Sequence, residues 1–151
     1  MIEFHADDYG MFEMQSRRIQ DCCREGCLNG VSIMPNGFYL AGGMEELRLL
    51  GGNMALTVHL NLVEGQCLSQ REDGRDLIDG EGNFNFSFGK LLILSYIPFA
   101  RKRYKGQIRK ELKNQINAVR PYLDENKIRL DSHCHYHMIP VVYDSMMEVI
   151  R

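Results

Sequence analysis

The sequence has no excess of basic residues. Its 18 Lys and Arg residues stand against 20 Asp and Glu residues, so the chain lacks the positive charge that binding to a phosphate backbone requires. A basic cluster at Arg101–Lys105 lies where a helix is expected to begin, and such a cluster is typical of a solvated helix face. We therefore expect no nucleic-acid partner.

Long apolar segments are also missing. The longest run, LLILSYIPFA from Leu91 to Ala100, is about half of the ~20 residues that cross a bilayer. The N-terminal segment Ile2-Glu3-Phe4-His5 has neither the basic start nor the apolar core of a signal peptide. We expect a soluble, cytoplasmic protein without a membrane partner.

Paired-cysteine motifs are absent from the sequence. An odd number of cysteines without a CxxC pair argues against a disulfide framework and against a zinc site made of thiolates. We expect reduced, partly buried thiols at the five cysteines, which are Cys22, Cys23, Cys27, Cys67 and Cys134.

The pattern of the chain predicts an α/β fold. A chain of 151 residues with 44% hydrophobic content fits one domain with a sizeable core. Strand-like segments at 1–8, 30–35, 54–62 and 127–133 are each followed by helical periodicity, at 9–26, 44–52, 108–119 and 141–151. Because strands and helices alternate, we expect four β/α units in which a parallel sheet is covered by helices.

One long segment interrupts this alternation. Residues 63–89 are rich in Gly, Asp, Asn and Ser and contain the turn sequences REDGRD and DGEGN. A connection of this length is expected to serve a function. We predict a loop or lid that forms part of a substrate mouth and is mobile without ligand.

Histidine is scarce but concentrated. Three of the five histidines, His133, His135 and His137, lie in the stretch LDSHCHYHMIP. They would share one face of a continuous strand, but Pro140 predicts that the chain turns near His133 and fans the imidazoles around one point. A His-x-His pair alone is more often a satisfied core or surface feature than a metal site.

Two further strand ends carry chemistry. His59 closes the third expected strand, and the adjacent carboxylates Asp7 and Asp8 close the first. Helix N-capping by Asp8 is a competing explanation of that aspartate. Three separate strand ends nevertheless converge in a parallel sheet, and two imidazoles with one carboxylate form the ligand set of catalytic zinc and related ions.

Four segments together resemble a known family. HADDYG, SIMPNG, VHLNLVEG and DSHCHYHMIP are similar in order and spacing to the signature segments of the YdjC-like carbohydrate deacetylases, which include chitooligosaccharide deacetylases. The resemblance implies an irregular (β/α) barrel of the glycoside hydrolase/deacetylase type. Residues 1–151 would form about half of it, a single N-terminal portion without the C-terminal half.

The resemblance also implies an activity and a cofactor. Members of this family are metal-dependent hydrolases that remove N-acetyl groups from amino sugars or chitooligosaccharides. One divalent ion, zinc or magnesium, would be held by Asp8, His59 and His133, and Asp7 would be the general base. The substrate would be an N-acetylated sugar.

Three neighbouring residues receive supporting roles under the same resemblance. Asp131 would orient one of the metal-binding imidazoles. His135 and His137 would lie behind the ligands or face the substrate. Cys134 occupies a position usually held by glutamine or histidine and adds a soft donor beside the site.

Half a barrel has physical consequences. Its outer strands carry unpaired backbone groups and its apolar side is uncovered, so we expect a homo-oligomer such as a dimer. The general acid that the family places in its C-terminal half would be missing, so we expect metal binding but weak activity. The alternative is a catalytically silent metal-binding or assembly module. A phosphoesterase is disfavoured because its His-x-His pair belongs on the first strand.

Overall fold

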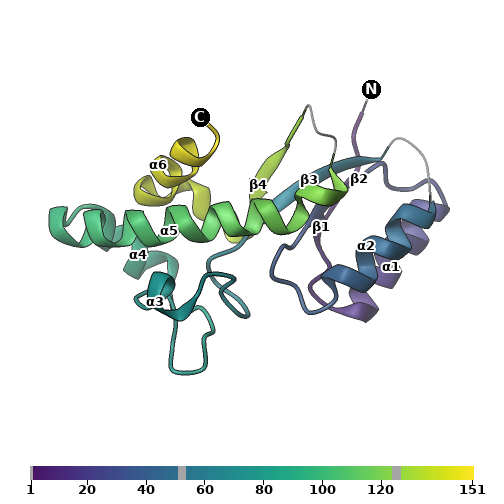
Figure 1. Cartoon of the computed structure of the whole chain (residues 1–151). Helices are drawn as coiled ribbons and strands as arrows, with labels where there is room; N and C mark the ends of the chain where they lie inside the picture. The colour runs from purple at the N-terminus through teal and green to yellow at the C-terminus, as the bar shows by residue number, and fades with distance from the viewer. Residues whose placement is uncertain (1, 51–53, 124–126) are drawn as a thin grey trace.

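The chain folds around a four-stranded parallel sheet. The computed structural model describes residues 2–50, 54–123 and 127–151. The strands pair in chain order (Figure 1), and they are β1 (His5–Tyr9), β2 (Gly30–Ile33), β3 (Ala55–Leu60) and β4 (Leu130–Ser132). Parallel neighbours that follow each other in sequence require crossover connections, so the predicted α/β fold is confirmed.

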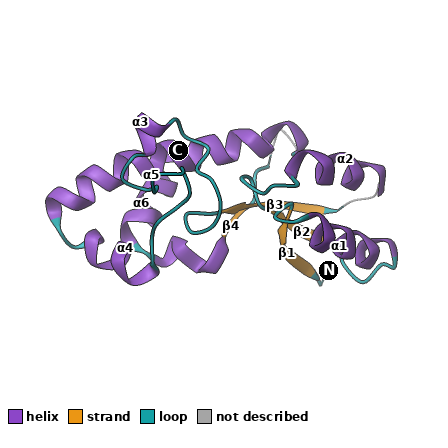
Figure 2. Cartoon of the chain, turned by 90° about the horizontal axis from the view of Figure 1, so that it is seen from below, coloured by secondary structure: helices purple, strands orange, loops and turns teal. Residues whose placement is uncertain are grey.

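Helices fill these connections and also follow β4. They are α1 (Glu13–Arg24), α2 (Leu40–Leu50), α3 (Arg71–Gly74), α4 (Phe88–Ser95), α5 (Pro98–Val119) and α6 (Pro140–Val149), with 3₁₀ turns η1 (Arg120–Tyr122) and η2 (His133–Met138). Figure 2 shows α1 and α2 beside β1 and β2, while α3, α4 and α6 gather beyond β4. The long helix α5 runs across the front of Figure 1 and joins the two groups.

The structure corrects the simple alternation of one helix after each strand. Among the described residues, three α-helices and a 3₁₀ turn, rather than one helix, lie between β3 and β4. The apolar run that begins at Leu91 is helix α4, in which Leu91 is fully buried. Pro98 then starts α5, because proline fits the first helical turn but cannot continue a preceding helix. In addition, α2 begins a turn earlier than expected, and β4 is shorter than 127–133.

The two faces of the sheet differ in polarity. Val31, Ile33 and Val58 are fully buried in the core against the helices. Side chains alternate along a strand, so the neighbours of these residues point to the opposite face. Two of those neighbours are polar, Ser32 beside Val31 and His59 beside Val58. The polar side chains Ser32 and His59 therefore lie on the face that the helices do not cover.

The segment 63–89 is packed rather than unsupported. Glu111, fully buried on α5, accepts hydrogen bonds from the backbone N–H groups of Leu68 and Ser69 at 3.1 and 2.8 Å, and from the Ser69 hydroxyl at 2.6 Å. Antiparallel bridges link Gln66 with Asn83. These contacts fix the segment at its start and its centre, while its mobility without ligand and its lid role stay predictions.

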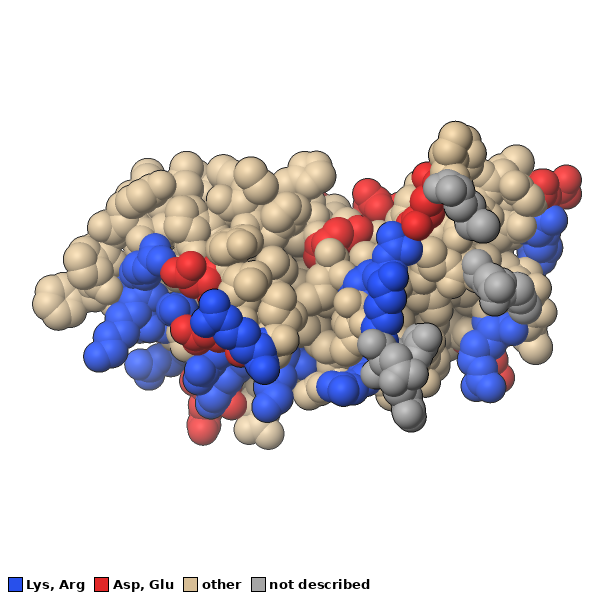
Figure 3. Space-filling model, turned by 90° about the horizontal axis from the view of Figure 1, so that it is seen from above, with Lys and Arg blue, Asp and Glu red and all other residues tan. Residues whose placement is uncertain are grey.

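Several basic residues of α5 are paired with acids. Arg101 forms an ion pair with Asp144, and Lys105 lies 2.6 Å from Glu148. In Figure 3 the Lys and Arg side chains gather along one side of the molecule with acidic groups among them. A basic helix face neutralised in this way fits the solvated face that the sequence predicted.

Two further features concern the cysteines and the apolar content of the helices. The five cysteines are all free thiols. Among the described residues, no helix has both the length and the apolar content needed to cross a membrane.

Candidate metal centre

A β-bulge brings Asp8 into the site. Ala6 pairs with Val31 and Tyr9 pairs with Ile33, so β1 carries one residue more than β2 across this interval. Asp8 has φ 62°, a left-handed conformation that is rare outside glycine. Such bulges re-aim side chains near functional sites. The competing N-cap explanation is wrong, because the N-cap residue of α1 is Phe12.

Three predicted residues meet at one point. One donor atom each from Asp8, His59 and His133 lies within 4.8 Å of the others. The Asp8 Oδ1 atom is 3.1 Å from His59 Nε2 and 2.8 Å from His133 Nδ1. The residues come from β1, β3 and the end of β4, so the expected convergence of strand ends is observed.

The described donors fit a cation. The Nε2 atom of His133 is buried and has no hydrogen-bond partner, and its nearest carboxylate oxygen, from Glu64, is 3.6 Å away. A buried polar atom without a partner carries a desolvation cost of about 1–3 kcal/mol. The donor set of Asp8, His59 and His133, two imidazoles with a carboxylate, suits zinc better than magnesium.

Asp131 holds the His59 imidazole from behind. Its Oδ1 atom lies 2.7 Å from His59 Nδ1, and its Oδ2 atom accepts a hydrogen bond of 2.5 Å from the Ser32 hydroxyl. Burial opposes a charge on His59, but the hydrogen bond to Asp131 and the nearby carboxylates outweigh it, so the pKa of His59 is raised. Burial likewise opposes ionisation of Asp131, yet the hydrogen bonds from His59 and Ser32 lower its pKa.

The hydrogen bonds that hold Asp131 and His59 continue toward the other end of the sheet. The sequence did not predict these contacts. The Ser32 hydroxyl is 2.8 Å from His5 Nε2, and His5 Nδ1 is 2.8 Å from a Glu3 oxygen. Arg129 binds both Glu3 oxygens at 2.7 and 2.9 Å. Gly30 leaves room for the His5 ring, because a Cβ atom there would lie 2.3 Å from His5 Nδ1.

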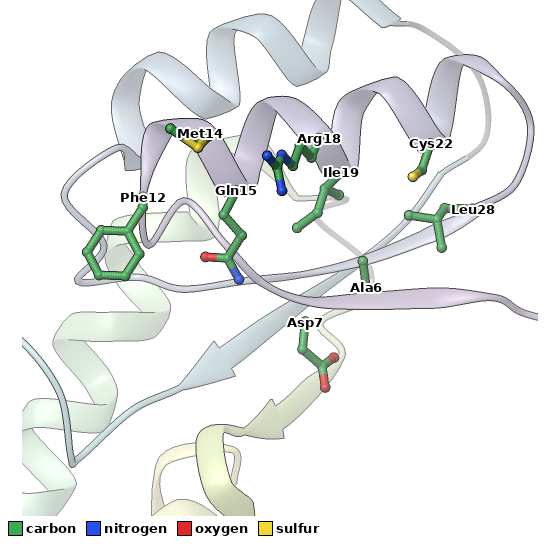
Figure 4. A pocket seen from close by; sticks show the side chains of 9 residues that line it. All are labelled: Ala6, Asp7, Phe12, Met14, Gln15, Arg18, Ile19, Cys22 and Leu28. Carbon is green, nitrogen blue, oxygen red and sulfur yellow. The ribbon is translucent and has the colours of Figure 1, made fainter.

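Asp7 lies outside the cluster that Asp8, His59 and His133 form. Figure 4 shows its carboxylate on the side of β1 opposite α1, where donor atoms of His5, Asp7 and Asp131 lie within 4.8 Å of one another. Asp7 also lines a hollow of about 650 Å³ beside α1, whose lining includes none of Asp8, His59 and His133. Its lining is mostly apolar, with Ile19 and Leu28 among the residues that Figure 4 labels.

The chain turns at His133, as the sequence predicted, but of the three clustered histidines only His133 joins Asp8 and His59. Strand β4 ends at Ser132, and Cys134 and His135 adopt left-handed φ values of 51° and 54°, so strand alternation stops before it can align the rings. The His135 and His137 rings instead contact each other, with centroids 5.9 Å apart. His137 Nδ1 lies 2.6 Å from the Ser132 hydroxyl, while His135 and Cys134 are exposed.

Glu64 is another residue that sequence reasoning missed. It follows β3 and is brought to His133 by amide contacts: Asn36 and Asn61 both donate to its backbone carbonyl, at 2.8 and 2.7 Å. Its position five residues after His59, within VHLNLVEG, was the available signal.

The comparison with known families decides the relationship. The model described as YdjC-like protein matches residues 1–151. The chain belongs to the YdjC-like protein family. The membership confirms the resemblance that HADDYG, SIMPNG, VHLNLVEG and DSHCHYHMIP suggested.

Curated YdjC-like relatives are named deacetylases. A carbohydrate deacetylase of Danio rerio is 26% identical over 145 residues, which are 96% of this chain and 44% of that protein. A chitooligosaccharide deacetylase of Enterobacter sp. (strain 638) is 25% identical over 143 residues, which are 95% of this chain and 52% of that protein. The chain thus spans about half the length of these relatives.

A solved structure supports the fold. The crystal structure of a protein from Enterococcus faecalis V583, provisionally named for cellobiose-phosphate cleavage, superimposes with a TM-score of 0.76 at 21% identity. The match covers 97% of this chain and 54% of that protein. The fold of this chain therefore corresponds to about half of that larger structure.

Proposed function

We propose that this chain carries the metal site of a hydrolase that removes N-acetyl groups from amino sugars or chitooligosaccharides. The observation that carries the proposal is the convergence of Asp8, His59 and His133, whose donor atoms lie within 4.8 Å of one another. In this proposal these three residues hold one divalent ion, zinc or magnesium. The deacetylase names of the relatives support an acetylated sugar as substrate.

A divalent ion in such a site polarises the amide carbonyl and acidifies water. Within the proposal, the remaining work falls to residues of this chain. Asp7, close to the cluster but outside it, accepts a proton from the attacking water. Asp131 keeps the Nδ1 proton of His59 on the far side of the ring, which leaves Nε2 free to bind.

We also propose that the chain self-associates. Strands β1 and β4 are the outer strands of the sheet, and an outer strand offers unpaired backbone groups to another chain. The proposed partners are thus a second copy of the chain and an N-acetylated sugar.

The decisive experiment measures metal binding and acetate release separately. Purified wild-type chain and the His133→Ala variant would be titrated with zinc and magnesium and then assayed with tri-N-acetylchitotriose. Metal-dependent acetate release that the variant loses supports the deacetylase. Metal binding without acetate release indicates the catalytically silent module, and absence of metal binding by the wild type refutes the site.

A further inference from the structure

Two aromatic side chains lie exposed at the edge of the sheet that carries the metal cluster. Phe12 follows β1 and is 51% exposed, and Phe38 follows β2 and is 74% exposed. Their ring centroids are 6.2 Å apart with an interplanar angle of 21°. Figure 4 shows the Phe12 ring projecting from the start of α1. Exposed aromatic side chains at the mouth of a site are characteristic of ligand contacts.

The backbone holds this aromatic pair in place. The N–H groups of Phe38 and Tyr39 donate to the carbonyls of Met11 and Gly10, at 3.2 and 2.9 Å. The two loops approach so closely that a Cβ atom on Gly37 would lie 2.1 Å from the Gly10 carbonyl oxygen. A preorganised surface of this kind loses little conformational freedom when a ligand binds.

A small hollow lies beside the pair. Its volume is about 90 Å³, and its lining includes Phe12, Phe38, Asn61 and Glu64. The Glu64 carboxylate also approaches His133 to within 3.6 Å. Since a water molecule takes about 30 Å³ of liquid volume, the hollow accepts a substituent but not a sugar ring. A ring would lie across the exposed aromatic faces.

We propose that Phe12 and Phe38 form a carbohydrate subsite that binds a pyranose unit of the substrate next to the metal centre. The proposal rests on the proposed function. The axial C–H groups of a pyranose are weakly positive and apolar, so they complement the negative face of an aromatic ring. Glu64 and Asn61 line the hollow with oxygen and nitrogen atoms that suit sugar hydroxyl or amide groups.

The absence of tryptophan from the chain allows a direct test. Phe38→Trp creates a single fluorescent reporter at the subsite, and Phe99→Trp creates a control at Phe99, which is 91% exposed at the start of α5. Titration with tri-N-acetylchitotriose should change the emission of Phe38→Trp and leave that of Phe99→Trp unchanged. By calorimetry, Phe38→Ala and Phe12→Ala should bind the trisaccharide about three- to tenfold more weakly, and Phe99→Ala should match the wild type.

Unchanged emission of Phe38→Trp together with unchanged affinity of Phe38→Ala would overturn the subsite. Loss of self-association in Phe38→Ala, with sugar affinity intact, would also overturn it and make the pair a protein contact. The proposed function fails differently. Sugar binding without acetate release would refute the deacetylase and leave the subsite standing. Acetate release with an unchanged KM in Phe38→Ala would refute the subsite and leave the deacetylase standing.

Discussion

The Asp131 carboxylate fixes the orientation of the His59 imidazole relative to Asp8. Asp131 Oδ1 lies 2.7 Å from His59 Nδ1, and the opposite ring nitrogen, Nε2, faces Asp8 at 3.1 Å. Because an ionised carboxylate can only accept a hydrogen bond, this contact places the ring proton on Nδ1, facing Asp131. The nitrogen that faces Asp8 then carries a lone pair that can bind a cation.

Replacement of Asp131 by asparagine should weaken metal binding. The amide group can donate to His59 Nδ1, which would move the ring proton to Nε2, the atom needed for the ion. We expect zinc affinity to fall about 10–100-fold in Asp131→Asn, measured by calorimetric titration. Glu25→Gln, an exposed residue past the end of α1, serves as the control. Equal zinc affinity in both variants would show that Asp131 does not orient the imidazole.

The three clustered histidines should respond differently to alanine substitution. His133 joins Asp8 and His59, whereas His135 is exposed and His137 contacts the Ser132 hydroxyl. We expect His133→Ala to lose bound zinc, while His135→Ala and His137→Ala retain it. Metal content per chain after gel filtration measures this, with circular dichroism as a check on folding. Zinc loss in His135→Ala alone would contradict the assignment.

The convergence of the site could be predicted because it depends on topology. In a parallel sheet all carboxyl strand ends lie at one edge, so residues that close strands meet there whatever the details of packing. Asp8, His59 and His133 each follow or end a strand, and alternation of strands with helices is visible in the sequence. These features need no knowledge of distances between side chains.

The remaining features depend on geometry that periodicity does not encode. The bulge at Asp8 exists only relative to the register of β2. The left-handed backbone at His135 could not be predicted, because no glycine occupies that position. The hydrogen bond from Ser32 to Asp131 reaches from β2 to β4 past the intervening β3, so it depends on the curvature of the sheet. Such contacts follow from three-dimensional packing alone.

The stability contributed by Asp76 should depend on pH. Asp76 binds the guanidinium of Arg103 and also the Gln107 amide, and the hydrogen bond from Arg103 is the main reason that the pKa of its carboxyl is lowered, against the effect of burial. A folded-state pKa below the unfolded value of about 3.9 stabilises the fold above that value. The contribution is lost as the pH falls through the lower, folded pKa.

We therefore expect Asp76→Asn to lower the free energy of unfolding by about 1 kcal/mol at pH 7, since Arg103 is more than half exposed. The difference from the wild type should shrink as the pH falls below about 4. Urea denaturation at several pH values measures both effects, with Glu25→Gln as the control. A difference that stays constant down to pH 2 would show that the charge of Asp76 is not responsible.

Two glycines with opposite surroundings give a matched test of the loop that carries Phe38. A Cβ atom at Gly37 would lie 2.1 Å from the Gly10 carbonyl oxygen, whereas one at Gly106, inside α5, would meet nothing within 4 Å. Gly37→Ala should therefore force the two loops apart and lower the free energy of unfolding by about 1–3 kcal/mol. Gly106→Ala should raise it by about 0.5–1 kcal/mol, because alanine has the higher helix propensity.

Urea denaturation of both variants measures these opposite signs. The local effect can be read separately in the Phe38→Trp background, where a displaced loop alters the tryptophan emission. We expect that emission to change in the double variant with Gly37→Ala and to stay the same with Gly106→Ala. If the two substitutions change stability in the same direction, the close approach at Gly37 does not constrain the loop, and the rigidity argued for the aromatic pair is lost with it.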